Sequence, residues 1–147
     1  MLPRFTKQGV LPPGMHRATW LQFEGRFGGT PERQRLLKGL RKALEALRAA
    51  GCQTVYLDGS FGTSKAVPGD FDGCWDIVGV DPELLDPVLL EFDEGRATQK
   101  AKYLGELFPA QMGEGGSGLT FLDFFQIDKE SGKPKGIVVL DLRRWKR

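Results

Sequence analysis

Leucines repeat at helical spacing in one stretch of the chain. Intervals of three and four residues place these side chains on one face of a helix: Leu36, Leu37, Leu40, Leu44 and Leu47. The run starts after Thr30-Pro31-Glu32, which is typical of a helix start because threonine caps, proline fits the first turn and the acid faces the positive dipole end. Gly51 follows where a helix-ending glycine belongs. The pattern predicts a helix between Thr30 and Gly51.

Other apolar runs predict four strands and three shorter helices. The expected strands are 53–58, 71–80 (weakened by Gly73), 119–127 and 136–142, and the last two are joined as a hairpin by turn residues at 128–135. The expected helices are 18–27, 82–91 and 95–108, with glycine-rich loops at 59–69 and 113–118. This order predicts an α+β fold, in which helices pack on a mixed or antiparallel sheet. We expect one domain over residues 1–147, with an extended lead-in segment at 1–29.

Composition places the chain among ordinary globular proteins. Its 147 residues include ten Phe, three Trp and two Tyr, which supply a core, while 20 Gly and nine Pro indicate many turns. Only two cysteines, Cys52 and Cys74, argue against a disulfide framework or a zinc cluster. No run approaches 18 apolar residues, and the first ten residues lack the apolar centre of a signal peptide. We therefore expect a cytoplasmic protein with no membrane contact.

Charge is strongly segregated along the sequence. Residues 1–50 hold ten Lys and Arg against three Asp and Glu, a net +7. Residues 51–125 hold four against thirteen, a net −9, and residues 126–147 hold seven against three, a net +4. This layout fits either solvated surface or an acidic metal site flanked by cationic surface that receives polyanions.

The acidic block contains a compact motif. An expected buried strand ends at Asp58-Gly59-Ser60, and the next strand opens with Asp70-Phe71-Asp72. Residues two apart on a strand share a face, so Asp70 and Asp72 lie about 6.7 Å apart along the chain. Two such carboxylates can hold a pair of divalent metal ions about 3.5–4 Å apart. Without cations, two like charges at that range repel each other.

The loop between the two halves of the motif carries phosphate-binding residue types. Gly59 allows close backbone approach, and Ser60 offers an amide and a hydroxyl. Thr63, Ser64 and Lys65 add further donors. The alternative interpretation is an ordinary turn followed by solvated acids, and for Asp58 a turn role is favoured over orienting a phosphate loop.

The run resembles the nucleotidyltransferase signature of the DNA polymerase beta-like superfamily. In that signature a hydrophobic residue, Gly and Gly or Ser are followed, after nine to thirteen residues, by two acids that flank a hydrophobic residue. Gly59 and Ser60, a nine-residue gap and Asp70-Phe71-Asp72 match it, whereas Gly73 departs from the usual hydrophobic residue. Over most of its length the chain also resembles small stand-alone bacterial nucleotidyltransferase-like proteins, on the Pro-Pro-Gly-Met-His lead-in, 56–72, 106–110, 124–126 and 135–137.

The resemblance implies a minimal nucleotidyltransferase fold and two-metal transfer of a nucleoside monophosphate. Mg²⁺ or Mn²⁺ would be the cofactor, a nucleoside triphosphate the donor, and a protein, an RNA or a small molecule the acceptor. Asp70 and Asp72 would bridge the metals, and Ser60 and Lys65 would hold the phosphates. The superfamily needs a third acid on a neighbouring strand, for which we choose Asp123, since a lone acid among apolar strand residues needs a partner.

Several weaker candidates stay open. Asp128 and Asp76 are the next choices for the third acid, and Arg96, Lys100 and Lys102 either reach phosphates or form a solvated helix face. His16 is the only histidine, which excludes a histidine-rich metal site. The alternative function is a partner-dependent or inactive nucleotidyltransferase-like binding module, such as one half of a toxin–antitoxin pair. A basic nucleic-acid binder is the third option, although neither terminal block interleaves aromatic and cationic residues along the sequence.

Overall fold

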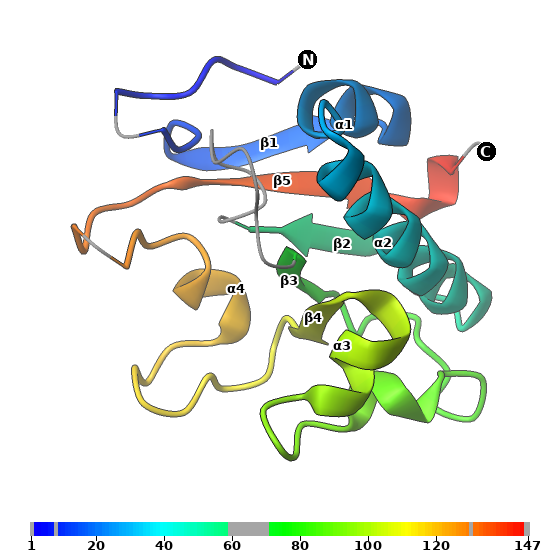
Figure 1. Cartoon of the computed structure of the whole chain (residues 1–147). Helices are drawn as coiled ribbons and strands as arrows, with labels where there is room; N and C mark the ends of the chain where they lie inside the picture. Colours follow the sequence, from blue (N-terminus) through cyan, green and yellow to red (C-terminus); the bar gives the residue numbers. More distant parts are fainter. Residues whose placement is uncertain (1, 8, 59–70, 130, 146–147) are drawn as a thin grey trace.

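A five-stranded mixed sheet forms the centre of the molecule (Figure 1). This computed structural model describes residues 2–7, 9–58, 71–129 and 131–145. The strand order is β1-β5-β2-β3-β4, in which the outer pairs β1–β5 and β3–β4 are parallel and the inner pairs are antiparallel. The strands are β1 (Gly14–Ala18), β2 (Thr54–Leu57), β3 (Phe71–Trp75), β4 (Gly105–Pro109) and β5 (Gly136–Asp141). The α+β fold expected from the sequence is confirmed.

Helices cover both faces of the sheet. They are α1 (Trp20–Phe27), α2 (Pro31–Ala49), α3 (Ala97–Tyr103) and α4 (Phe121–Phe124), with 3₁₀ turns η1 (Pro87–Leu90) and η2 (Leu142–Arg144). The leucine face of α2 packs in one buried cluster with Val55, Leu57 and Phe71 of the neighbouring strands. The long helix predicted from the leucine spacing is therefore confirmed, together with its Thr30 cap, whose side chain accepts from the Arg33 amide. No described helix has the length and apolar character that crossing a membrane requires.

The opposite face, which we call the second face, carries a separate aromatic cluster. Cys74 of β3, Phe108 of β4 and Ile137 of β5 meet Phe121 of α4 and Phe125 there. The Phe108 and Phe121 rings stack with centroids 4.1 Å apart. Alternation along β3 places Asp72 on the same face as Cys74.

The region 95–108 is not one helix as predicted. α3 ends at Tyr103, because Leu104 adopts a left-handed backbone with a φ of 67°. The chain then forms β4 beside β3, where Gly105 lies so close to Phe71 that a Cβ atom would meet its carbonyl oxygen at 2.5 Å. The short apolar run of β4 fits a helix or a strand equally well, and the sequence pattern alone does not separate them.

The predicted strand 119–127 and its hairpin are also wrong. Residues 121–124 form α4, because the Thr120 side chain accepts from the Asp123 amide and begins a helical turn. β5 pairs instead with β1 and β2, and 127 and 134 share only an isolated bridge. β1 lies inside the segment predicted as an extended lead-in.

Two further element boundaries differ from the sequence expectation. The strand starting at Phe71 ends at Trp75 rather than continuing to Val80. The helix expected at 82–91 is reduced to η1, in which Pro87 occupies the first turn behind the Asp86 cap. Proline inside the expected helix removes a donor and limits it to a short turn.

Gly73 does not interrupt β3. It pairs with Leu57 of β2 and Leu107 of β4, and a Cβ atom there would meet the Tyr56 carbonyl oxygen at 2.2 Å. The missing side chain at Gly73 therefore permits close approach of the strands.

We expect Gly73→Ala to lower the free energy of unfolding by about 2 kcal/mol or more, since strand backbones must move apart. Urea denaturation measures this. Gly25→Ala in α1 is the matched control: its Cβ would have nothing within 4 Å, and alanine should stabilise the helix by roughly 0.5–1 kcal/mol. Equal, small effects of both changes would contradict the close-approach role.

Candidate functional site

An acidic row crosses three adjacent strands on the second face. Asp58 follows β2 directly, and its amide donates to the carbonyl oxygen of Asp72 in β3 at 2.9 Å. Asp72 is in register with Glu106 of β4. Directly opposed residues share a face of a sheet, so the three acidic side chains project from the same face. Asp72 of the predicted motif therefore lies in this row, next to Glu106, which the sequence analysis did not select.

The first member of this row is neutralised in the interior. The Lys135 ammonium lies 2.8 Å from Asp58 Oδ1, and the side chains are only 9% and 4% exposed. Lys135 stands immediately before β5, where its amide donates to the Gln126 carbonyl oxygen at 2.8 Å. A buried charge of either sign is costly without its partner, so this pair fixes the end of β2 against the start of β5.

The last member of the row is held by two cations, one at the N-cap of α3 and one within that helix. Arg96 Nε lies 3.1 Å from Glu106 Oε2, and Lys100 Nζ lies 2.9 Å from Oε1. The Arg96 guanidinium also lies over the Phe108 ring, 5.7 Å from its centroid. Unlike Lys135, both cations are accessible, with side chains 35% and 44% exposed. The sequence left open whether these residues reach phosphates, and the structure places them beside the acidic row.

Asp123 is not on a buried strand, so the premise for choosing it as the third acid is wrong. It lies on α4 with an exposed side chain, and its amide is capped by Thr120. The carboxylates of the two alternative candidates, Asp76 and Asp128, accept hydrogen bonds from nearby residues. Asp76 Oδ1 accepts from Gln111 at 2.7 Å and from the Val78 amide at 3.0 Å, and Asp128 Oδ2 accepts from Ser131 at 2.8 Å. By strand register, the acid on the strand beside Asp72 is Glu106 and not Asp123.

Sequence reasoning missed Glu106 because its strand was read as part of a helix. Once Gly105–Pro109 is known to be a strand parallel to β3, an acid directly beside Asp72 follows from the register alone. The available signal was the glycine before an apolar run that ends at Pro109, which is also compatible with a strand.

The rest of the motif lies outside the described residues. This holds for Asp70 and for the expected phosphate-binding residues, namely Gly59, Ser60, Thr63, Ser64 and Lys65. Their segment connects Asp58 to Phe71, so in sequence it starts and ends at the acidic row. Among the residues that the structure does describe, no three His, Cys, Asp or Glu side chains converge as a metal site.

The remaining candidate residues make contacts away from the acidic row or are buried in the core. Lys102 binds Asp86 Oδ2 at 2.6 Å rather than the acidic row. His16 Nε2 hydrogen-bonds the Pro12 carbonyl oxygen at 2.6 Å. Burial raises the pKa of the Cys52 thiol to about 11 and that of Cys74 further still, so both stay protonated at neutral pH.

Comparison with known proteins gives a family and no function. No curated protein and no solved structure matches the sequence. A family model does match, and it covers residues 3–141, which include β1 through β5 and the whole acidic row. The chain belongs to the family of unknown function DUF6932.

Proposed function

We propose that the chain is a metal-dependent nucleotidyltransferase that transfers a nucleoside monophosphate from a nucleoside triphosphate to an acceptor oxygen, with pyrophosphate as the leaving group. The observation that carries the proposal is the register of Asp72 in β3, the last residue of the signature, with Glu106 in β4. An acid pair on one strand and a third acid on its neighbour is the arrangement that the resemblance requires. The minimal nucleotidyltransferase fold is part of this proposal.

The donor set suits Mg²⁺ or Mn²⁺, because both prefer carboxylate oxygens. Asp70, Asp72 and Glu106 would hold the metal, which would supply charge neutralisation for the triphosphate and the acceptor oxygen. Asp58 is excluded from this set, since its carboxylate is committed to buried Lys135. Glu106 is available because Arg96 and Lys100 are exposed enough to turn away.

Arg96 and Lys100 have a second use in this proposal. Once released from Glu106, their positive groups stand next to the acidic row and can bind the triphosphate of the donor. Ser60 and Lys65 stay our candidates for the same task, together with Gly59, Thr63 and Ser64. Binding from both sides would hold the phosphates in line for transfer.

One observation favours the alternative, a partner-dependent or inactive binding module. Glu106 has two cationic partners within 3.1 Å, which is also the arrangement of a structural ion-pair network. In that case the chain would bind a protein partner, for example as half of a toxin–antitoxin pair, without transferring nucleotides itself.

Ligand-induced stabilisation tests donor binding. We expect Mg²⁺ or Mn²⁺ together with one of the four nucleoside triphosphates to raise Tm, because a ligand that binds only the folded state stabilises it. At a hundred times Kd the gain is about 2.7 kcal/mol, or roughly 5–10 °C for a domain of this size. Thermal-shift measurement with all eight combinations checks this.

The matched variants make the result specific. Asp72→Asn should lose the metal-dependent part of the shift, whereas Asp123→Asn on exposed α4 should keep it. No shift in the wild-type protein with any combination would count against the proposed donor site.

A further inference from the structure

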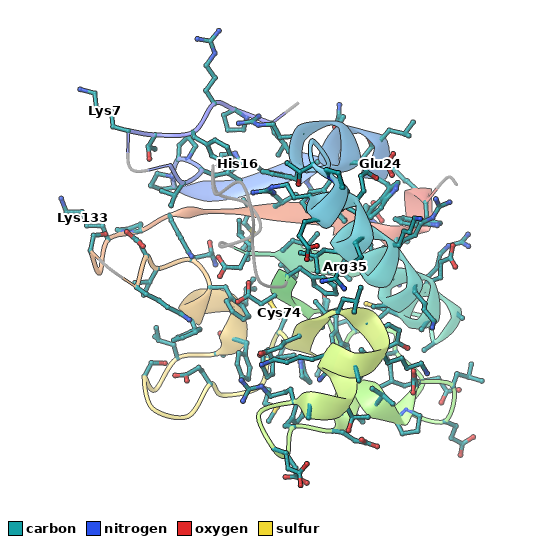
Figure 2. All side chains as sticks on the ribbon, in the orientation of Figure 1. Lys7, His16, Glu24, Arg35, Cys74 and Lys133 are labelled. Carbon is teal, nitrogen blue, oxygen red and sulfur yellow. The ribbon has the colours of Figure 1, made fainter. Side chains whose placement is uncertain are left out.

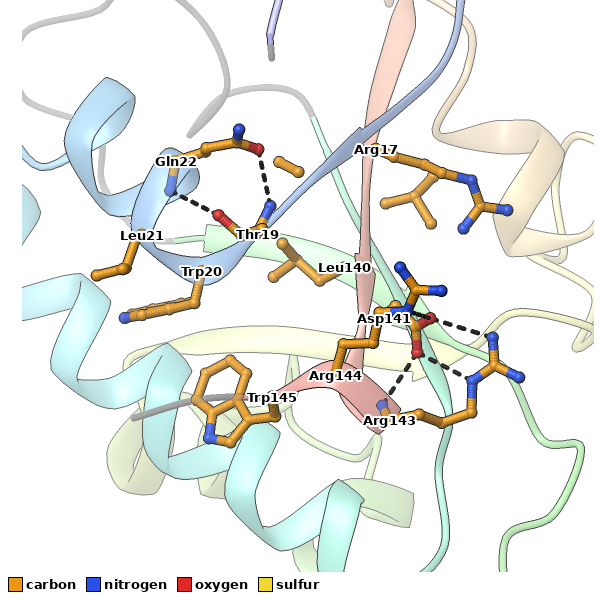
Figure 3. Close-up of a pocket in the computed structure, with 12 residues that line it drawn as sticks. Arg17, Thr19, Trp20, Leu21, Gln22, Leu140, Asp141, Arg143, Arg144 and Trp145 are labelled. Carbon is orange, nitrogen blue, oxygen red and sulfur yellow. Dashed lines mark hydrogen bonds and ion pairs between the residues drawn. The ribbon is translucent and has the colours of Figure 1, made fainter.

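A pocket lies at the opposite end of β5 from the acidic row (Figure 3). It has a volume of about 640 Å³, within the range of small-molecule and cofactor sites. The end of β1 and the start of α1 form one wall, and the end of β5 with η2 forms the other. The pairing of β1 with β5 therefore creates it, by joining the two terminal segments that hold the basic blocks of the sequence.

Three arginines line this pocket together with one acid, Asp141. Arg143 binds Asp141 through Nε and Nη2 at 3.0 and 3.1 Å, and Arg144 Nε lies 3.9 Å from the same carboxylate. Arg17 of β1 is exposed and makes no ion pair with any described carboxylate. Arg144 is 88% exposed, so its long contact to Asp141 holds it loosely. One carboxylate against three guanidinium groups leaves a local charge of +2 for an anionic ligand.

The other side of the pocket is aromatic. Trp20 and Trp145 pack together with ring centroids 5.3 Å apart, and both line the cavity. Figure 3 shows them on the other side of β5 from Asp141 and the Arg143 side chain. Trp20 is buried and fixed by Glu24, which accepts from its Nε1 at 3.1 Å, while Trp145 is partly exposed. An indole and guanidinium groups that line one pocket offer a stacking surface for a base and contacts for the phosphates of a single strand.

The basic group lies on the same face of the sheet as the acidic row. Arg17 is in register with Val139, and Val139 with Tyr56, which is two residues before Asp58 in β2. Asp141 is in register with Thr54. From Thr54 to Asp58 is about 13 Å at the rise of a strand. A bound strand of two or three nucleotides can therefore extend from the arginines to the acidic row.

We propose that this pocket binds a single-stranded nucleic acid, with its phosphates on Arg17 and Arg144 and a base against Trp145. The proposal deepens the proposed function, on which it rests only for the role of that strand as the acceptor. Double-stranded nucleic acid fits less well, because its bases are not free to enter a pocket. The terminal blocks do not interleave aromatic and cationic residues in sequence, but the β1–β5 pairing brings both kinds into the lining of one pocket.

Direct binding tests this without metal or nucleoside triphosphate. The probe is a labelled twelve-nucleotide RNA of mixed, unstructured sequence, measured by fluorescence anisotropy at low salt. Arg17→Gln with Arg144→Gln should weaken binding at least about tenfold and lower the slope of log K against log salt by about 1.4. Arg4→Gln with Lys7→Gln removes the same charge from two exposed residues outside the pocket and should change Kd less than about twofold.

Competition identifies the ligand class. Trp145→Leu should weaken RNA binding severalfold yet leave binding of polyphosphate unchanged, because only the base needs the ring. Duplex RNA of the same sequence and adenosine monophosphate should compete poorly. Tm values close to that of the wild-type protein confirm that each variant is folded.

Several outcomes would overturn the proposal. They are equal losses in the pocket and control variants, full binding by Trp145→Leu, equal affinity for duplex or mononucleotide, and capture by anionic vesicles in place of RNA. The binding assay contains neither metal nor nucleoside triphosphate, so its result does not depend on whether the acidic row supports transfer. Failure of nucleotidyl transfer is thereby distinguishable from failure of this site.

Discussion

Asp72→Asn is expected to reduce transfer of labelled nucleotide by at least about a hundredfold, because the substitution removes a charge that stabilises the transition state through the metal. The measurement incubates purified protein with Mg²⁺ and each α-labelled nucleoside triphosphate, using a cell lysate as the source of acceptors. A lysate is chosen because it contains protein, RNA and small-molecule acceptors together. Glu106→Gln should cause a loss of similar size, since Glu106 faces Asp72 across the β3–β4 pair.

Three matched acids serve as controls for this assay. Each control removes one negative charge at a position that is not paired with Asp72 in the sheet. The variants are Asp123→Asn, Asp76→Asn and Asp128→Asn, and each should keep activity within about twofold. Full activity in Glu106→Gln combined with loss in Asp123→Asn would restore the third acid chosen from the sequence. It would also contradict the assignment made from the strand register.

The same assay separates the enzyme from the binding module. An autonomous enzyme puts label on an acceptor in the lysate and loses it in Asp72→Asn. A partner-dependent protein labels nothing alone but modifies a protein that co-purifies with it. A protein that binds its partner equally well with and without Asp72, and transfers no label in either state, is the inactive module.

The secure parts of the fold were those with strong local signals. The helix from Pro31 to Ala49 has a cap, an initial proline and a full apolar face, so local preference and burial agree. β2 and β5 are short apolar runs bounded by turn residues, and both were predicted within about two residues.

The failures share one physical cause, which is that short apolar runs have no period of their own. The apolar patterns at 105–109 and 119–127 each fit a helix or a strand, and tertiary contacts decide which of the two forms. At 119–127 the Thr120 cap begins a helical turn, whereas at 105–109 the edge of β3 provides a strand to pair with. Pairing between distant segments, such as β1 with β5, leaves no local trace, so the basic pocket could not be predicted.

Only the part of the candidate site that lies on one strand could be predicted from the sequence. Asp72 could be chosen because the signature is local, whereas Glu106 depends on which strand lies beside β3. The electrostatic partners were equally hidden: Lys135 lies 77 residues from Asp58 in the sequence, yet the two charges meet in the interior.

Lys135→Met is expected to lower the free energy of unfolding by about 3–5 kcal/mol, the largest stability effect that we foresee. The methionine fills similar volume, so the loss reports the charge rather than a cavity. It leaves the Asp58 carboxylate, 4% exposed, without the ammonium group at 2.8 Å. Urea denaturation monitored by tryptophan fluorescence gives the value.

Lys133→Met is the matched control, because Lys133 is exposed two residues earlier on the same connection (Figure 2). Its effect should stay within about 0.5 kcal/mol. The double variant Asp58→Asn with Lys135→Met should recover much of the stability lost in Lys135→Met, because it removes the uncompensated buried charge. Additive losses would show instead that each residue acts through packing. Because Asp58 directly precedes Gly59, recovery of stability without recovery of transfer would mean that this ion pair also positions the motif from which the proposed donor site is built.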